Sequence, residues 1–269
     1  EEKAKIIEKR AARLRTLARI KTEDWDGIII SHNMFERFPL TPETTAAFIQ
    51  EQVDTLERTV KEAKGEHMSK LSISGMETRI ANLKEKLKDI LDTDLDDIGI
   101  PFEQLGIDQL FVDEADMFKN LYYTTSMDRV SGLAQSNANR SNDMFAKTQW
   151  LTRAMGGRGV VFATGTPISN TMAEMYTMLR YLDMQGLKEK KLDMFDNWIR
   201  TFAEVGSGME RKPTGDGFRK VNKVKRFINM ADLNKMFRKV ADVKTQEDLD
   251  LDIPKLKNNK PTIVKIKAD

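Results

Sequence analysis

Three short apolar runs, separated by long helical stretches, constrain the fold of this chain more than any other feature of its sequence. The runs span residues 25–31, 107–114 and 159–167 and are rich in β-branched and aromatic residues, which is typical of buried strands. Strands that alternate with helices along a chain build a mostly parallel sheet covered by those helices. Because the helical stretches are much longer than the runs, we expect an α/β fold that is helix-rich overall and has a small sheet.

The spacing of apolar residues predicts the helices around this sheet. Residues 1–20 carry apolar side chains at intervals of three and four on a basic background, which indicates a helix. Heptad-like spacing across 49–60 and again across 76–90, with a polar stretch between, predicts an antiparallel helical hairpin. The other expected helices lie near 144–155, after residue 171 and roughly over 225–240.

Polar composition marks two loops and one helix start. Residues 124–143 are rich in Asn and Ser, and residues 206–223 are rich in Gly and Lys. Both stretches are therefore predicted to be flexible loops. Thr171 and Glu174 have the three-residue spacing of a capping box, which predicts that a helix begins there.

Composition excludes several classes of function. There are no cysteines and only two histidines, which excludes disulfides, thiolate zinc sites and a histidine-rich metal centre. Lys and Arg number 44 against 42 Asp and Glu, so attraction to nucleic acid or to a membrane requires a local patch. No apolar run approaches the roughly 20 residues of a membrane span, and no signal peptide is recognised. We expect a cytoplasmic protein without a membrane partner.

Acidic residues crowd the end of the second apolar run. Asp113 and Glu114 directly follow the apolar residues 110–112, and Asp116 comes two positions later. Ligands of parallel α/β sheets sit at the carboxyl ends of strands, and neighbouring residues of an extended chain point in opposite directions. The two acids therefore suit different tasks: Asp113 would hold Mg²⁺ through water, and Glu114 would orient or deprotonate an attacking water. A solvated acidic turn explains the same residues equally well at this point.

Two threonines flank a glycine where the third apolar run ends. Thr164, Gly165 and Thr166 precede a proline in the stretch "FATGTPISN". Hydroxyl groups on a strained turn at the same edge of the sheet would hydrogen-bond the acidic stretch and relay its state. The simpler alternative is an ordinary strand–turn–helix connection with a threonine cap.

Both stretches, in this order, resemble motifs of the superfamily-two helicase-like ATPases. "LFVDEADMFKN" resembles the Walker B motif of the Swi/Snf-like branch, and "VVFATGTPISNTMAEMYTMLRYL" resembles its third motif and the helix that follows. "DWDGIIISHNMFERFP" is similar to the strand that precedes a helical insertion in the same branch. Residues 19–43 look most like bacterial and phage-borne proteins that join such an ATPase to an adenine-specific DNA methylase.

The resemblance implies a role for each matching residue. Asp113 would face Mg²⁺, and Glu114 would activate the water that attacks ATP. Asp116 stands where histidine is more usual in this branch, and it would couple the metal site to the third motif. Residues 164–166 would link the state of ATP to contacts with DNA. Lys119 matches the tail of the first motif, without an implied role.

One part of such a motor is missing from the sequence. A phosphate-binding loop needs Gly-x-x-x-x-Gly-Lys-Ser/Thr, and this chain contains no Gly-Lys dipeptide. We therefore expect a fragment of a first RecA-like lobe, a partial P-loop NTPase fold, whose parent protein uses Mg²⁺ and ATP. Alone the fragment should bind neither and be inactive. Its expected partners are double-stranded DNA, a second motor lobe and a methylase domain of the same bacterial or phage-encoded parent chain.

The resemblance also implies how the chain is divided. The expected segments are 1–43, a helix and the first strand of the lobe; 44–100, the helical hairpin insertion; 101–205, the part of the lobe with both motifs; and 206–269, a basic loop, a helix and a linker toward the second lobe.

The basic loop of the last segment supplies candidate contacts to DNA phosphates. A solvated loop is the alternative interpretation. The candidate residues are Arg211, Lys212, Lys220, Lys223, Lys225 and Arg226.

Two interpretations from other classes stay open on sequence alone. A non-catalytic helical interaction module would carry the acidic strand end incidentally. A Mg²⁺-dependent nuclease or phosphohydrolase would use Asp113, Glu114 and Asp116, but it needs more converging acids than one strand end supplies.

Overall fold

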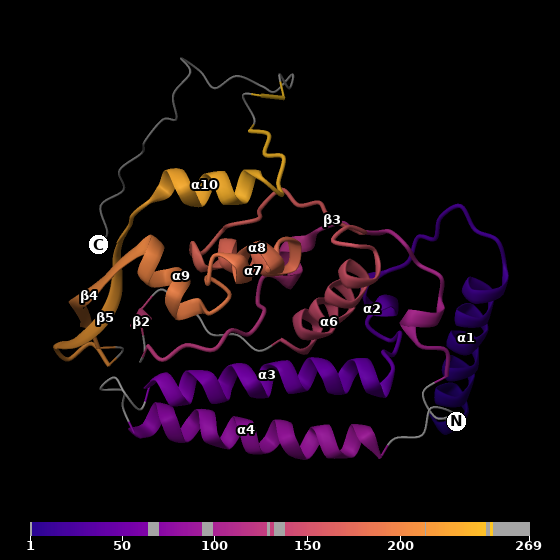
Figure 1. The fold of residues 1–269 in the computed structure, drawn as a ribbon. Coiled ribbons are helices and arrows are strands. Elements are labelled where there is room, and N and C mark those ends of the chain that lie inside the picture. The colour runs from indigo at the N-terminus through magenta and orange to yellow at the C-terminus, as the bar shows by residue number, and fades with distance from the viewer. Residues whose placement is uncertain are drawn as a thin grey trace, which may run out of the picture.

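The computed structural model shows helices around a small parallel sheet and a long β-hairpin at one end of the molecule (Figure 1). It describes residues 2–63, 70–92, 99–127, 130–131, 138–212, 214–245 and 248–249. No helix within these ranges is long and apolar enough to cross a membrane. The helices are α1 (Glu2–Thr22), α2 (His32–Phe35), α3 (Pro42–Ala63), α4 (Lys70–Leu91), α6 (Asn139–Ala154), α7 (Ala173–Leu182), α8 (Met184–Glu189), α9 (Phe195–Phe202) and α10 (Met230–Arg238), with 3-10 turns η1 (Phe102–Gln104) and η2 (Ala115–Phe118). The strands are β1 (Leu110–Val112), β2 (Val130–Ser131), β3 (Val160–Phe162), β4 (Ala203–Arg211) and β5 (Phe218–Phe227).

The strands form two separate sheets. β1 and β3 make a two-stranded parallel sheet, whereas β2, β5 and β4 make a three-stranded sheet in that order, with β4 antiparallel to β5. Figure 1 shows the β4–β5 hairpin at the end of the molecule opposite α1, with helices α6 to α9 between them. The α/β prediction is therefore confirmed in its coarse form, and the RecA-like lobe stays a prediction.

Two apolar clusters share helix α7. One surrounds β1 and α6 and includes Val112, Phe118 and Tyr181. The other surrounds α9 and includes Tyr176 and Trp198. Because Tyr181 and Tyr176 lie on the same helix, α7 joins the core beneath the acidic loop to the core beneath the β-hairpin.

Helices α3 and α4 form the predicted helical hairpin. They run side by side along one edge of the molecule (Figure 1). Leu56, Val60 and Met76 are buried in the seam between them, as the heptad-like spacing predicts. An exposed ion pair of 2.7 Å between Glu51 and Arg153 joins α3 to α6.

Residues 25–31 do not form the predicted strand, and this prediction is wrong. Ile28 is 42% exposed and Ile29 is fully exposed, and the segment has no regular structure. A strand is stabilised by the ladder of hydrogen bonds to a neighbour. Within the described residues β1 pairs with β3 alone, so no neighbouring strand supports the apolar run.

The predicted basic loop over 206–223 is also wrong, because most of it is the β4–β5 hairpin. Its glycines and lysines suggested a loop, yet they fit one another across the two strands. A Cβ atom on Gly206 would lie 2.3 Å from Lys225 Cε, so the lysine stem occupies the space that a side chain would fill. Because β5 continues to Phe227, α10 begins at Met230 rather than near 225.

The predicted flexible loop over 124–143 is partly regular. Val130–Ser131 pairs with β5, and α6 already begins at Asn139. Residues 128–129 and 132–137 lie outside the described part of the chain, as does most of the predicted linker after residue 249.

The hydroxyl of Tyr181 connects three elements and generates a test of this packing. Tyr181 is buried in α7, and its hydroxyl lies 3.1 Å from the Phe118 carbonyl and 2.8 Å from the Ser141 carbonyl. Burial raises the pKa of this phenol, so it remains a hydrogen-bond donor. Tyr181→Phe should lower the free energy of unfolding by about 1–3 kcal/mol in urea titrations, because buried acceptors lose their donor.

Tyr122 offers a matched control for that substitution. Its side chain is partly exposed, so Tyr122→Phe should change the free energy of unfolding by less than about 0.5 kcal/mol. Equal losses in the two variants would contradict the role given to Tyr181.

Candidate active site

The parallel pairing of β1 with β3 brings two polar loops to one edge of the sheet. Val112 lies opposite Phe162 in the register. Backbone hydrogen bonds continue beyond the strands, from the Ala163 amide to the Val112 carbonyl at 2.8 Å and from the Ala115 amide to the Ala163 carbonyl at 3.0 Å. The loop that carries Asp113 and the loop that carries Thr164 therefore leave the sheet side by side.

Glu114 adopts a left-handed backbone conformation at the end of β1. Its φ is 50° and its ψ is 45°, a region that costs a residue with a side chain roughly 1–2 kcal/mol. This turn leaves Glu114 exposed and buries the neighbouring Ala115. Asp113 Oδ1 accepts a hydrogen bond of 3.1 Å from the Glu114 amide. Residues with a strained backbone conformation, as at this exposed carboxylate, are found preferentially at functional sites.

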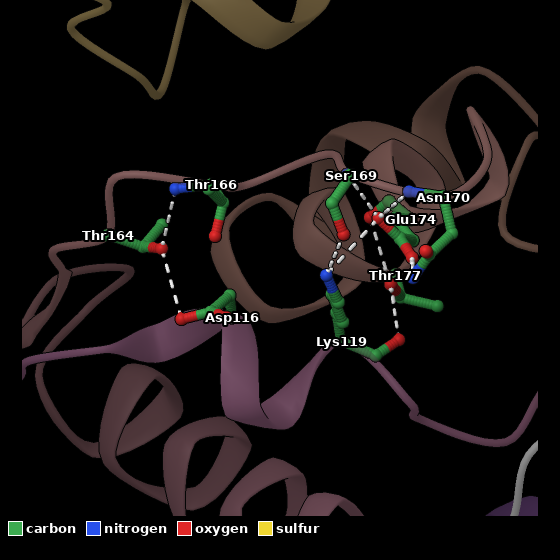
Figure 2. A network of polar contacts seen from close by, with 8 residues as sticks. All are labelled: Asp116, Lys119, Thr164, Thr166, Ser169, Asn170, Glu174 and Thr177. Carbon is green, nitrogen blue, oxygen red and sulfur yellow. Dashed lines mark hydrogen bonds and ion pairs between the residues drawn. The ribbon is translucent and has the colours of Figure 1, made fainter. Parts of the chain in front are cut away.

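Asp116 and the Thr164–Thr166 loop are in direct contact. The Thr164 hydroxyl donates a hydrogen bond of 3.2 Å to Asp116 Oδ1, and the Thr166 amide donates one of 3.1 Å to the same hydroxyl (Figure 2). Gly165 between them has no positive φ and open space where a Cβ would stand. The strain expected in this turn is therefore not at Gly165; it lies across the sheet edge at Glu114.

Lys119 makes a second and more buried connection between the loops. Its ammonium group lies 3.6 Å from Glu174 Oε2, and the two side chains are only 11% and 10% exposed. The same ammonium group donates a hydrogen bond to the Ser169 hydroxyl, and the Thr177 hydroxyl donates one of 3.0 Å to the Lys119 carbonyl (Figure 2). The end of the acidic loop is thereby fastened to the start of α7.

Glu174 collects the amides that precede α7. Its carboxylate accepts hydrogen bonds from the Ser169 amide at 2.7 Å and from the Asn170 amide and side chain at 3.2 and 2.8 Å. Burial alone would raise the pKa of Glu174, but these hydrogen bonds, with the charge of Lys119, hold that pKa below its usual value. Glu174 does not cap Thr171 as the predicted capping box requires, because it is drawn to amides further back.

Lys119 and Glu174 are the residues of this site that sequence reasoning missed. Lys119 had no assigned role, and Glu174 was taken for a local helix cap. The available signal was a lysine that closely follows the acidic stretch and a glutamate that closely follows the threonine stretch, since these two stretches were already expected to meet. Only the parallel register shows that they face each other.

The site can serve a metal bound to a nucleotide better than a metal held by protein alone. Mg²⁺ usually takes one or two carboxylates and completes its shell with water and phosphate oxygens. Asp113 and Glu114 are exposed and offer such carboxylates. Among the described residues, no group of three or more His, Asp or Glu side chains could enclose a metal ion.

The predicted DNA-contact residues lie apart from these acids. Arg211 and Lys212 stand at the tip of the β4–β5 hairpin, and Lys220, Lys223 and Lys225 lie along β5. Arg226 lies near the hairpin's base, where it forms two hydrogen bonds with Glu204. The structure therefore brings Asp116 and Thr164 together, whereas it places the basic residues on a different element.

Comparison with known proteins identifies a family. The family model described as "Probable helicase domain" matches residues 3–245, and the chain belongs to this family. It is also 29% identical over 161 residues to Defense against restriction protein B of Escherichia phage P1. That match covers 58% of this chain and 7% of the phage protein, so the chain corresponds to a small part of that relative. No solved structure matches the chain.

The ionised state of Glu174 predicts a pH-dependent contribution to stability. Because the folded protein depresses the pKa of Glu174, stabilisation is present above the pKa of unfolded Glu, about 4.3, and is lost as the pH falls through the lower folded value. Glu174→Gln should reduce the free energy of unfolding at pH 7 by about 1–3 kcal/mol. It should also flatten the decline of that free energy below about pH 4.3.

Glu51 provides the control for this measurement. It is paired with Arg153 on the surface, and exposed pairs contribute about 0–1 kcal/mol. Urea titrations of Glu51→Gln should therefore follow the wild type across the same pH range. A Glu174→Gln protein whose pH dependence also follows the wild type would remove Glu174 from this role.

Proposed function

We propose that this member of the probable helicase domain family is part of a DNA-dependent ATPase motor. In this proposal, the edge formed by the Asp113–Asp116 and Thr164–Thr166 loops is one wall of the site where ATP is hydrolysed. The observation that carries the proposal is the hydrogen bond from Thr164 to Asp116, because it links an acidic strand end to a hydroxyl-bearing one at the sheet edge where ligands of parallel sheets bind.

Asp113 and Glu114 divide the chemistry between them. Asp113 would offer an exposed carboxylate to the Mg²⁺ that accompanies ATP, and that ion would neutralise charge on the phosphates. Glu114, held exposed by its left-handed backbone, orients the attacking water and accepts its proton. Among the residues that the structure describes, no three His, Asp or Glu side chains converge on one point. This fits the proposed arrangement better than a nuclease site, which needs several carboxylates around its metals.

Asp116 and Thr164 transmit the state of the site to the rest of the molecule. Any shift of Asp116 changes the hydrogen bond to Thr164, and the Thr166 amide is bound to the same hydroxyl. The Lys119–Glu174 pair holds the far end of both loops. In this proposal, the two loops move only where the edge of the β1–β3 sheet faces the nucleotide.

A larger lobe would complete the site. The chain has no Gly-Lys dipeptide and hence no phosphate-binding loop of the usual kind. Phe111 is 74% exposed and Val161 is 42% exposed on one face of the two-stranded sheet, an apolar face that further elements of a larger lobe would cover. We assign these elements and the phosphate-binding loop to another part of the same parent protein, and this chain to its first RecA-like lobe.

The finer assignments rest on sequence resemblance. The Swi/Snf-like motifs favour a motor that translocates on double-stranded DNA with the help of a second lobe. The similarity to a phage protein named for defence against restriction supports a bacterial or phage origin and a DNA partner. A methylase domain in the same parent chain belongs to this proposal as well.

The proposal predicts the behaviour of Glu114→Gln. The 269-residue chain alone should not hydrolyse ATP steadily, because it lacks the phosphate cradle. In the parent protein, Glu114→Gln should retain ATP binding and lower the hydrolysis rate at least about 100-fold, within the range for loss of a general base. Phosphate release and binding of labelled ATP measure the two quantities.

Asp108→Asn is the matched control, since Asp108 is an exposed acid before β1. It should leave hydrolysis by the parent protein unchanged. Unaltered turnover in Glu114→Gln, or steady hydrolysis by the chain alone, would contradict the proposed site.

A further inference from the structure

A cleft of about 400 Å³ lies between helix α3 and the body formed by α6 to α9, and Figure 1 shows α3 running alongside these helices. One wall is the face of α3. The opposite wall comes from the segment 121–124, α6, α7 and the chain that leads into α9. The acidic loop 113–116 and the threonine loop 164–166 contribute no lining residue, so the cleft is separate from the candidate active site. Its volume lies within the range of small-molecule sites, about 300–1,000 Å³.

Two ion pairs join α3 to the body across this cleft. Glu51 of α3 lies 2.7 Å from Arg153 of α6, and Arg58 of α3 lies 3.9 Å from Asp193, which precedes α9. All four residues line the cleft, and Thr55 stands between the two pairs on the same face of α3. The seven positions from Glu51 to Arg58 correspond to about 10 Å along a helix. The space between the pairs therefore has the length of a ligand with one or two rings.

Aromatic side chains supply much of the apolar surface of the cleft. Phe145 and Tyr176 are buried there. Tyr123 stacks on Phe195 with the ring centroids 4.0 Å apart, and the partly exposed Tyr122 lies next to it in the chain. Flat apolar walls of this kind favour a planar ring as their occupant.

Arg180 places a positive charge among these rings. Its guanidinium carbon lies 4.8 Å from the centroid of the Phe145 ring, and Nη1 donates a hydrogen bond of 2.6 Å to the Tyr122 carbonyl. Within the described ranges no carboxylate lies at ion-pair distance from Arg180, whereas Arg58 and Arg153 have one each. A guanidinium carries five N–H donors, and the Tyr122 carbonyl occupies one of them. The others are available to a ligand.

The remaining charges that line the cleft do not neutralise Arg180. Four of them form the two ion pairs, and the other two, Asp54 and Lys188, are exposed and opposite in sign. A guanidinium binds carboxylate-like groups through paired N–H donors, and these bonds are strengthened by the charge. An arginine without an acidic partner, set between aromatic faces, is therefore complementary to a planar anion.

We propose that this cleft binds a small planar aromatic anion. Its acidic group accepts hydrogen bonds from Arg180, and its ring lies between α3 and the rings of Phe145 and Tyr176. A neutral ring lacks the charge-assisted hydrogen bonds, and a small anion without a ring leaves the aromatic walls uncovered, so neither feature alone gives full affinity. The inference goes beyond the proposed hydrolysis of ATP and does not depend on it, since the two sites share no residue.

The test is a calorimetric titration of the 269-residue chain with 2-naphthoate, with 2-naphthamide and with acetate at pH 7. Naphthoate should bind about tenfold more tightly than the neutral amide of the same shape, because hydrogen bonds between charged partners are stronger than those to a neutral group. Acetate should show no measurable binding at the same concentrations, because it covers none of the aromatic surface.

Three variants locate the binding. Arg180→Gln should weaken naphthoate binding about tenfold and change amide binding less than about twofold, because only the charged contact is lost. Arg158→Gln removes an exposed arginine outside the cleft, and it should leave both affinities unchanged. Thr55→Trp places a large side chain on the α3 wall and should abolish binding of both ligands while Arg180 stays in place. Circular dichroism checks that each variant is folded.

Several results would overturn the inference. They are equal affinities of the wild type for naphthoate and for the amide or for acetate, no binding of naphthoate, equal effects of Arg180→Gln and Arg158→Gln, or wild-type affinity in Thr55→Trp. Should Arg180→Gln fail to fold, the three ligands with the wild type and with Thr55→Trp still decide. The titration contains no ATP, so its failure is distinguishable from failure of the site proposed around Glu114.

Discussion

The parallel pairing of β1 with β3 is the constraint on which the candidate site depends. Two loops that lie about 50 residues apart in the sequence become neighbours because Val112 and Phe162 occupy matching positions at the strand ends. A slip of one residue would turn each side chain to the opposite face. Gly159 helps to set the register, because its φ of +96° and the Asp108 carbonyl, 2.8 Å from where a Cβ would stand, admit only glycine.

The two connections between the loops differ in strength, and that difference suits a site that changes state. Loss of the largely buried Glu174 carboxylate from its pair with Lys119 costs about 1–3 kcal/mol, whereas a single hydrogen bond such as Thr164 to Asp116 contributes about 0.5–1.5 kcal/mol. The buried pair therefore fixes the frame, and the weaker bond can rearrange within it. Strain of roughly 1–2 kcal/mol at Glu114 is of the same size as the Ala115–Ala163 hydrogen bond that accompanies it.

The elements that local pattern alone determines were predictable from the sequence. The heptad-like spacing of apolar residues predicted α3 and α4, and two of the three apolar runs predicted β1 and β3. Each of these elements packs or pairs with only one neighbour, which the same kind of pattern also predicts. Residues 25–31 and the β4–β5 hairpin were mispredicted for opposite reasons. An apolar run forms a strand only beside a partner, and the glycines and lysines of the hairpin form strands because they complement each other across the pair.

The candidate site follows the same division. Asp113, Glu114, Asp116 and the Thr164–Thr166 loop were predicted as candidates because acids and hydroxyls at strand ends can be recognised in the sequence, and the structure brings Asp116 and Thr164 into contact. The Lys119–Glu174 pair was not, since its meaning depends on two loops meeting in space. The cleft beside α3 was likewise hidden, because its walls come from segments that lie far apart in the sequence.

The contact between the two strand ends can be measured directly, since the chain contains no cysteine. A protein with Asp116→Cys and Thr164→Cys, treated with a short thiol-specific cross-linker, should form an intramolecular link under native conditions that is lost in urea. The pair Asp116→Cys with Thr214→Cys, whose second position lies in the turn of the β4–β5 hairpin, should not. Cross-linking of the first pair no more efficient than that of the second would contradict the placement of both loops at one edge.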